Sequence, residues 1–260
     1  MSKPKNKAEE KPTKAGHIFP APEWTHLSAS LAASLAHEIR NPLLSIRGAA
    51  QLLAQVVGDE DKTLAQLIIT EAARIEQLVA TMDPLTPNPS QISEALNIHE
   101  VTEYVRRAAS SFAGDVQIST QYDPSLPQVY VVREALIQAL INLVKNSVEA
   151  LKPSPAGGEG TLAAPFVPTV IIGTKYLVGE RMQRPDGNKL NIQVTVTDNG
   201  PGIAEDVVPR LFTPFSSTKE HGKGLGLAIV AKIVEEHGGL IAYDAPDKGG
   251  ARFTLYLPVA

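Results

Sequence analysis

The sequence predicts an α+β protein in which a hairpin of two long helices precedes a sheet covered by helices. Apolar residues recur every three or four positions through residues 25–57 and 64–82, which is the spacing of amphipathic helices. After residue 93, runs rich in β-branched residues alternate with two further helical patterns, as in a layered sheet-and-helix domain. The proline-rich segment "DPLTPNPS" separates the two parts and predicts a linker over residues 84–92.

The composition limits the classes of function. The chain has 260 residues, a net charge of −4 and a pI of about 5.9, which argues against nucleic-acid binding through a basic surface. It has no cysteine, which excludes disulfides, thiolate catalysis and cysteine zinc sites. No apolar run reaches the roughly 18 residues that a membrane span needs. We therefore expect a cytoplasmic protein with no membrane and no nucleic-acid partner.

The N-terminal part divides into a tail and a hairpin. Residues 1–24 are rich in Lys, Glu and Pro and poor in apolar residues, so we expect a disordered tail. Two helices joined by the polar turn "GDED" predict an antiparallel hairpin over residues 25–83. One hairpin cannot bury both of its apolar stripes. Two hairpins paired into a four-helix bundle can bury them, so we expect a homodimer.

The C-terminal part, residues 93–260, is expected to form one domain. A Gly/Pro-rich insertion at residues 152–168 predicts a mobile loop within it. The runs "TVIIGTKYLV" and "LNIQVTVTD" predict antiparallel neighbouring strands. The order of elements predicts a sheet with helices on one face, with strands at 116–122, 169–178, 190–198, 239–246 and 250–258 and helices at 132–151 and 224–239.

The first helix carries an ionisable side chain on its polar face. On a helical wheel the apolar stripe is centred between Leu35 and Ile39, and His37 falls almost opposite that centre. Asn41 lies about 40° from His37 and shares its face. These positions predict that His37 faces solvent or a partner. A surface histidine without a role is the alternative on this helix alone.

Pro42 follows His37 within one and a half turns. A proline inside a helix removes a backbone hydrogen bond and clashes with the carbonyl four residues back, here that of Glu38, at a cost of roughly 3 kcal/mol. The sequence therefore predicts a bend on the turn that carries His37 and Glu38, which favours a shaped site over a neutral surface.

Two motifs in the C-terminal part suit a nucleotide. Asn142 and Asn146 are four residues apart on one face of a helix, and an amide carbonyl is a good ligand for Mg²⁺ held mainly by phosphates. A capping or core hydrogen-bond role for this pair is the alternative. Asp198 ends a strand, and its carboxylate could accept a hydrogen bond from an exocyclic amine. Gly200 and Gly202 permit close backbone approach and unusual φ values.

A glycine-rich turn, "GKGLGL", runs into the next predicted helix. Its glycines are Gly222, Gly224 and Gly226. Backbone N–H groups and the helix N-terminus make a phosphate cradle in such a turn. The spacing matches neither a Walker A loop nor a dinucleotide-binding fingerprint.

The motifs together resemble those of bacterial two-component sensor histidine kinases. The segment "HEIRNPL" resembles their phospho-acceptor box. Four later segments resemble the ATP-binding boxes of the GHKL (Bergerat) fold: "NLVKNSVEA", "DNGPGI", "LFTPFSSTK" and "GKGLGL". The sequence around His37 is most similar to that of the nitrogen-regulation (NtrB-type) group. The resemblance implies a dimeric helical bundle that carries the histidine and one ATP-binding GHKL sandwich per subunit.

The resemblance also implies roles for residues of the first helix. His37 would be the phospho-acceptor. Glu38 would orient the ring and act as the base for its second nitrogen. Asn41 would position water for removing phosphate from the partner regulator.

For the ATP site, the resemblance implies that Asn146 ligates Mg²⁺ with support from Asn142. Asp198 would contact the adenine amine, and Gly200 and Gly202 would give the base room.

The segment between these boxes, residues 199–224, would form a lid over ATP. Lys219 and Lys223 are candidates for phosphate contact, and exposure in a solvated loop is the alternative for both lysines.

The implied enzyme is an ATP-dependent protein-histidine kinase. It would pass the phosphoryl group from ATP·Mg²⁺ to His37 and then to an aspartate of a response regulator receiver domain, and would also dephosphorylate that regulator. A PII-type protein or another protein would supply the input. One alternative is a GHKL ATPase, which uses a Glu where this chain has Asn142. The other is a nucleotide-independent phosphotransfer or scaffold dimer.

Overall fold

The computed structural model describes residues 17–19, 24–80, 92–152, 166–178, 182–184, 187–214, 216 and 224–260. Within these ranges the side chains of residues 17–19, 24–37, 59, 60, 77, 78 and 80 lie outside the description. The predicted linker falls largely within residues 81–91 and the predicted mobile loop largely within residues 153–165. Both of those ranges lie outside the described residues.

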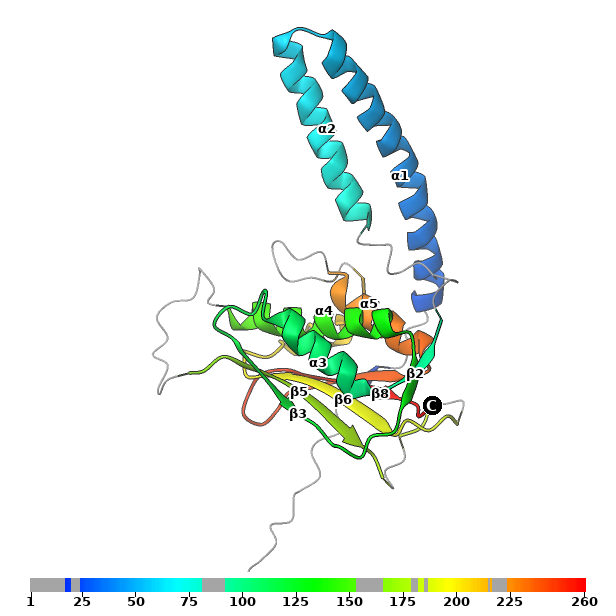
Figure 1. Ribbon diagram of the computed structural model, residues 1–260, viewed down its shortest axis with the longest axis vertical. Helices are drawn as coiled ribbons and strands as arrows, with labels where there is room; N and C mark the ends of the chain where they lie inside the picture. Colours follow the sequence, from blue (N-terminus) through cyan, green and yellow to red (C-terminus); the bar gives the residue numbers. More distant parts are fainter. Residues whose placement is uncertain are drawn as a thin grey trace, which may run out of the picture.

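A hairpin of two long helices forms the N-terminal part (Figure 1). Helix α1 spans Trp24–Val56 and helix α2 spans Asp59–Ala80, as the apolar periodicity predicts. Helix α1 continues through Pro42, and the bend expected there stays a prediction. No helix in the described ranges is both long enough and apolar enough to span a lipid bilayer.

The two helices of the hairpin meet along a seam of small and medium apolar side chains. Leu43 and Ala50 of α1 are seven residues apart, as are Ala65, Ala72 and Val79 of α2, and all five are buried. A seven-residue spacing keeps such side chains on one stripe of a helix. Alanines at three of these positions let the helix backbones approach closely.

A second set of apolar side chains on the hairpin is exposed. Five of them also repeat at seven-residue intervals and form what we term the apolar stripe: Ile39, Ile46, Leu53, Ile68 and Ile75. When the buried residues of α1 face those of α2, helical geometry puts the five residues of the apolar stripe on the same side of the hairpin. An apolar stripe of this length is typical of a surface that packs against another protein.

The C-terminal part is built on one six-stranded mixed sheet. Its strand order is β1-β7-β8-β6-β5-β3, and only β3 and β5 are parallel neighbours. The strands are β1 (His17–Phe19), β3 (Gln117–Gln121), β5 (Thr169–Tyr176), β6 (Ile192–Asp198), β7 (Leu240–Asp244) and β8 (Arg252–Leu257). The predicted antiparallel pairing of the two central strands is confirmed, with Ile172 opposite Val196.

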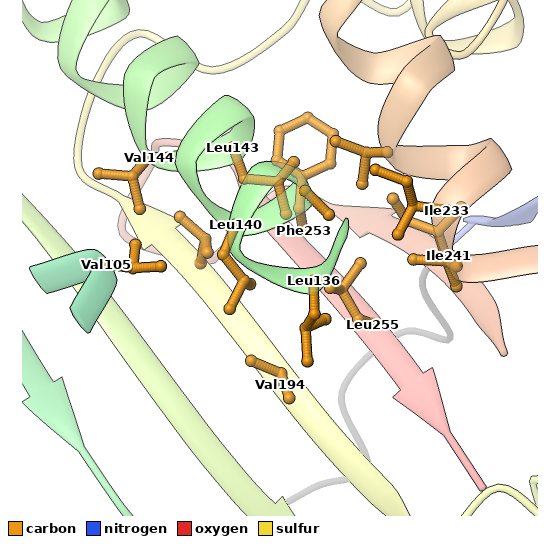
Figure 2. Close-up of a cluster of buried hydrophobic side chains, with 14 of the residues drawn as sticks. Val105, Leu136, Leu140, Leu143, Val144, Val194, Ile233, Ile241, Phe253 and Leu255 are labelled. Atoms are coloured by element: carbon orange, nitrogen blue, oxygen red, sulfur yellow. The ribbon is translucent and has the colours of Figure 1, made fainter. Parts of the chain in front are cut away.

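Three helices cover one face of this sheet (Figure 1); the sequence predicts helices on one face but only two of these three, because α3 is missing from the prediction. They are α3 (Ile98–Ala109), α4 (Arg133–Leu151) and α5 (Gly226–Glu236). Figure 2 shows the core between the layers, where Leu136, Leu140 and Leu143 of α4 point toward Val194 and Leu255 of the sheet. A two-stranded ribbon of β2 (Glu94–Leu96) and β4 (Val129–Val131) and a 3₁₀ turn η2 (Val208–Arg210) complete the described part.

Within the predicted disordered tail, residues 1–24, three residues form a strand and Trp24 begins helix α1. His17–Phe19 forms strand β1, antiparallel to β7, with Ile18 opposite Ala242. Backbone pairing with an edge strand needs no apolar core of its own, so the polar composition of the tail does not prevent it. Residues 1–16 and 20–23 lie outside the described residues.

Candidate functional site

Helix α4 brings its two asparagines to the start of helix α5. Asn142 Nδ2 donates a hydrogen bond to the Gly226 carbonyl over 3.5 Å. A Cβ atom added to Gly226 would lie 3.6 Å from Asn146 Nδ2. Both asparagines are half-buried. The fold therefore joins the asparagine pair and the last glycine of "GKGLGL", as expected if they serve one site.

The Asp198 carboxylate is buried and held by three donors. Its Oδ1 accepts from the backbone N–H of Gly200 over 3.0 Å and from that of Ala251 over 3.2 Å. Its Oδ2 accepts from the Ser147 hydroxyl over 2.9 Å. A buried carboxylate needs such donors because burial otherwise disfavours its charge. Asp198 is thus fixed as an acceptor at the end of β6.

Two residues that contact Asp198 escaped the sequence reasoning. Ser147 follows Asn146 on the buried face of α4, and a single serine among apolar residues gives no pattern of its own. Gly250 has a φ of +94°, and a Cβ there would lie 1.9 Å from the Asp198 carbonyl oxygen. The paired glycines Gly249 and Gly250 are a signal that could have indicated a close backbone contact.

The two glycines of "DNGPGI" are required for different reasons. Gly202 has a φ of +77°, a left-handed conformation that favours glycine. Gly200 lacks a positive φ, but a Cβ there would lie 3.1 Å from Asp198 Oδ1. Asn199 is a structural member of the motif, since its side chain accepts from the Thr169 N–H and donates to the Val167 carbonyl.

Three aromatic side chains pack together near the "DNGPGI" segment. The Tyr243 ring of β7 is tilted against Phe253 at 5.5 Å, and Phe212 meets Phe253 edge-on at 6.3 Å. Phe212, the first aromatic of "LFTPFSSTK", is therefore a core residue. Burial raises the pKa of Tyr243, a backbone hydrogen bond from Ile203 opposes the rise, and the charge of Asp198 adds to it. The Tyr243 hydroxyl therefore stays protonated at neutral pH.

The glycine-rich turn is described only at its helical end. Gly224 has a φ of +64° and precedes the start of α5 at Gly226. Lys219, Gly222 and Lys223 lie outside the described residues, so their predicted phosphate contacts stay predictions.

The predicted phospho-acceptor lies on α1, thirteen residues after Trp24. The side chain of His37 lies outside the described residues. Asn41 is exposed, as the helical wheel predicts for the polar face, and Glu38 is exposed as well. The backbone of α1 thus carries the three residues within little more than one turn.

Two family models match the chain. "Histidine kinase-, DNA gyrase B-, and HSP90-like ATPase" matches residues 131–260, and "His Kinase A (phospho-acceptor) domain" matches residues 28–85. The fold and the site define a two-part class of protein, in which a phospho-acceptor hairpin precedes an ATPase-type sandwich. The chain belongs to the family of histidine kinase-, DNA gyrase B- and HSP90-like ATPases, and its hairpin carries the His Kinase A (phospho-acceptor) domain.

Curated relatives and solved structures agree with this assignment. The chain is 44% identical over 247 residues to the sensory histidine kinase/phosphatase NtrB of Rhizobium leguminosarum bv. phaseoli, covering 92% of this chain and 61% of that relative. It is also similar in fold to full-length ShkA in complex with AMPPNP, with a TM-score of 0.60 and 23% identity over 89% of this chain and 47% of that one. Histidine kinase ThkA in complex with response regulator TrrA has a TM-score of 0.56 and 23% identity, over 92% and 64% of the two chains.

The chain spans less than two thirds of the length of the curated relatives first matched, 61% of the Rhizobium protein and 58% of the NtrB of Azospirillum brasilense. The region shared with those relatives contains both the hairpin and the sandwich.

Proposed function

We propose that the protein is an ATP-dependent histidine kinase that phosphorylates His37 and passes the phosphoryl group to an aspartate of a response regulator receiver domain. The observation that carries the proposal is the buried Asp198 carboxylate, held as an acceptor next to the helix that bears Asn142 and Asn146. The match of the phospho-acceptor domain to residues 28–85 supports His37 as the acceptor.

The base of ATP would be recognised at Asp198. The carboxylate accepts a hydrogen bond from the exocyclic amine of adenine, which guanine replaces with a carbonyl oxygen. Gly200 and Gly202 keep side-chain atoms away from the base. The selectivity follows because two acceptors facing each other repel, whereas an acceptor facing a donor attracts.

The phosphates and Mg²⁺ would lie between α4 and the start of α5. The side-chain oxygens of Asn142 and Asn146 fit an ion held mainly by phosphates, since they are neutral oxygen ligands, and the N-terminus of α5 beside them suits the phosphates themselves. When bound, Mg²⁺ would neutralise charge on the phosphates. Lys219 and Lys223 would add positive charge, and Gly222, Gly224 and Gly226 would offer backbone N–H groups. The lid over the nucleotide would be formed by residues 199–224.

The reaction would take place on α1. A nitrogen of His37 attacks the γ-phosphorus, an N–P bond forms, and the bond from that phosphorus to the β–γ bridging oxygen breaks to release ADP. Glu38 holds the ring and accepts the proton from its second nitrogen. Asn41 positions a water that attacks the phosphorylated aspartate of the regulator, which gives the protein a phosphatase activity as well.

The proposed domain limits follow the sequence analysis. They are a tail at 1–24, a phosphotransfer and dimerisation hairpin at 25–83, a linker at 84–92 and an ATP-binding domain at 93–260. The protein would act in the cytoplasm as a homodimer, with a PII-type protein or another docking protein as its input. The complex of ThkA with response regulator TrrA supports a receiver domain as the partner.

The test is incubation with Mg²⁺ and γ-labelled ATP of the wild type, His37→Gln and His99→Gln. We expect acid-labile, base-stable label on the wild type and on His99→Gln, and none on His37→Gln. His99 is the control because it lies on α3, where its ring stacks on Tyr122 at 4.7 Å. Label that persists in His37→Gln would refute His37 as the acceptor. Release of phosphate without any label would favour the ATPase, and failure to bind ATP would favour the scaffold.

A further inference from the structure

The hydroxyl of Ser147 is buried against the carboxylate of Asp198. Ser147 is 2% exposed and Asp198 is 5% exposed, and the hydroxyl donates to Asp198 Oδ2 over 2.9 Å. The two residues come from different layers of the sandwich, helix α4 and strand β6. Ser147 also directly follows Asn146, so one turn of α4 contacts both ends of the proposed nucleotide site.

The hydrogen bonds of Asp198 leave one acceptor position on Oδ2. Each carboxylate oxygen accepts about two hydrogen bonds. Oδ1 already accepts from the N–H groups of Gly200 and Ala251. Oδ2 accepts from Ser147 alone among the described residues. The remaining acceptor position on the carboxylate is therefore adjacent to the Ser147 hydroxyl.

We infer that Ser147 is a positioning residue that sets the preference of the site for a base with an exocyclic amine. Its hydroxyl fixes Oδ2, so that the remaining lone pair receives the amine of adenine. The inference rests on the proposed ATP binding. Ala251, on the other side of the carboxylate, contributes only its backbone N–H, so a side-chain change at 147 is the direct way to alter this set of donors.

Loss of this hydroxyl has a specific consequence. Without it, Oδ2 has to recruit a water, and the carboxylate gains freedom to turn away from the amine. The energy of the amine contact then falls, whereas contacts to the ribose and phosphates are unaffected. A role limited to holding α4 on the sheet would instead weaken every nucleotide equally.

The experiment compares two nucleotides on the whole protein. Dissociation constants are measured for ATP and for purine riboside triphosphate, which lacks the exocyclic amine, with the wild type, Ser147→Ala and Thr102→Val. We expect the wild type to prefer ATP by about tenfold or more, and Ser147→Ala to reduce that ratio by about three- to tenfold. Thr102 is the control, because its hydroxyl is also buried and donates a hydrogen bond, to the His99 carbonyl on α3, away from Asp198. Thr102→Val should keep the ratio.

The outcomes separate this inference from the proposed function. Failure of the wild type to bind ATP refutes ATP binding itself. Wild-type binding with an unchanged ratio in Ser147→Ala, whether both nucleotides weaken equally or neither does, overturns the role of Ser147. If Ser147→Ala does not fold, Ser147→Cys replaces it, and its weaker S–H donor should give an intermediate ratio. At saturating ATP, the rate of His37 labelling should change less than the KM.

Discussion

Among the described glycines, Gly250 leaves the least room for a side chain. Its φ is +94°, and a Cβ would lie 1.9 Å from the Asp198 carbonyl oxygen. We expect Gly250→Ala to lower the free energy of unfolding by about 3 kcal/mol or more, because backbone has to move. Gly114→Ala is the control, since Gly114 has a φ of +59° with open space around it and should cost about 1 kcal/mol. Urea unfolding measures both, and equal losses would contradict the close contact.

Asp123 makes the stability of the sandwich depend on pH. Its carboxylate accepts from the Ser125 hydroxyl, the Tyr176 N–H and the Ser125 N–H, which lower its pKa from 3.8 to about 2. A lowered pKa means that the fold favours the ionised form. The stabilisation is therefore complete above about pH 4 and disappears as the pH falls toward 2.

Asp123→Asn tests this dependence. The difference in free energy of unfolding between the wild type and Asp123→Asn should be largest at pH 6 and shrink steadily between pH 4 and pH 2. Urea titrations at several pH values measure it. Asp115→Asn serves as the control, because Asp115 is an exposed carboxylate of the same domain. A difference that does not vary with pH would mean that these hydrogen bonds do not depend on the charge.

At the scale of elements, periodic segments could be predicted and isolated ones could not. Helices α4 and α5 and strands β5 to β8 are marked by apolar runs in the sequence, because each packs against the same core. Strand β1 has three residues and pairs through its backbone, which leaves no pattern in the sequence. The parallel pairing of β3 with β5 depends on tertiary arrangement, so neither strand alone could reveal it.

The residues of the site also divide into those that a sequence pattern could predict and those that it could not. Asn142, Asn146, Asp198 and the glycines stand in motifs with fixed spacing, and their convergence could be expected once the motifs were recognised together. Ser147 contributes through one hydrogen bond across layers, and no spacing rule predicts which buried serine meets which carboxylate.

An ion pair between Arg47 and Glu76 joins α1 and α2. Their side chains are 33% and 19% exposed, and Glu76 Oε1 is buried without a described partner. Removing one member of a partly buried pair leaves the other charge less well compensated. We expect Glu76→Gln to lower the free energy of unfolding of the hairpin by about 1–3 kcal/mol.

Glu71→Gln is the matched control on the same helix. Glu71 contacts Arg74 at 3.6 Å, with side chains that are 51% and 72% exposed, so its loss should change stability by less than about 0.5 kcal/mol. Thermal unfolding of both variants measures the difference. Replacing both members of the partly buried pair, as Arg47→Met with Glu76→Leu, should recover the loss, and failure to recover it would indicate that the pair is required in itself.

For the whole molecule, the apolar stripe is the surface on which the oligomeric state of the hairpin depends. A kinase that dimerises through this stripe would bring two His37 side chains and two ATP sites into one particle. Ile39, Ile46, Leu53, Ile68 and Ile75 stay exposed on a single hairpin, and a second copy would bury them on both partners. The charge of a glutamate in that stripe would have to be buried twice in a symmetric dimer.

We therefore expect Ile46→Glu to convert a dimer into monomers. Each lost isoleucine contact is worth about 2 kcal/mol, so the two copies should raise the dissociation constant about a thousandfold. Gln55→Glu is the control, because nine residues at 100° each place Gln55 on the opposite side of α1. Sedimentation equilibrium measures the assembly, and ATP binding should survive in both variants, since the sandwich has its own core. A dimer that survives Ile46→Glu would place the interface on another face, and the proposed four-helix bundle would have to be abandoned.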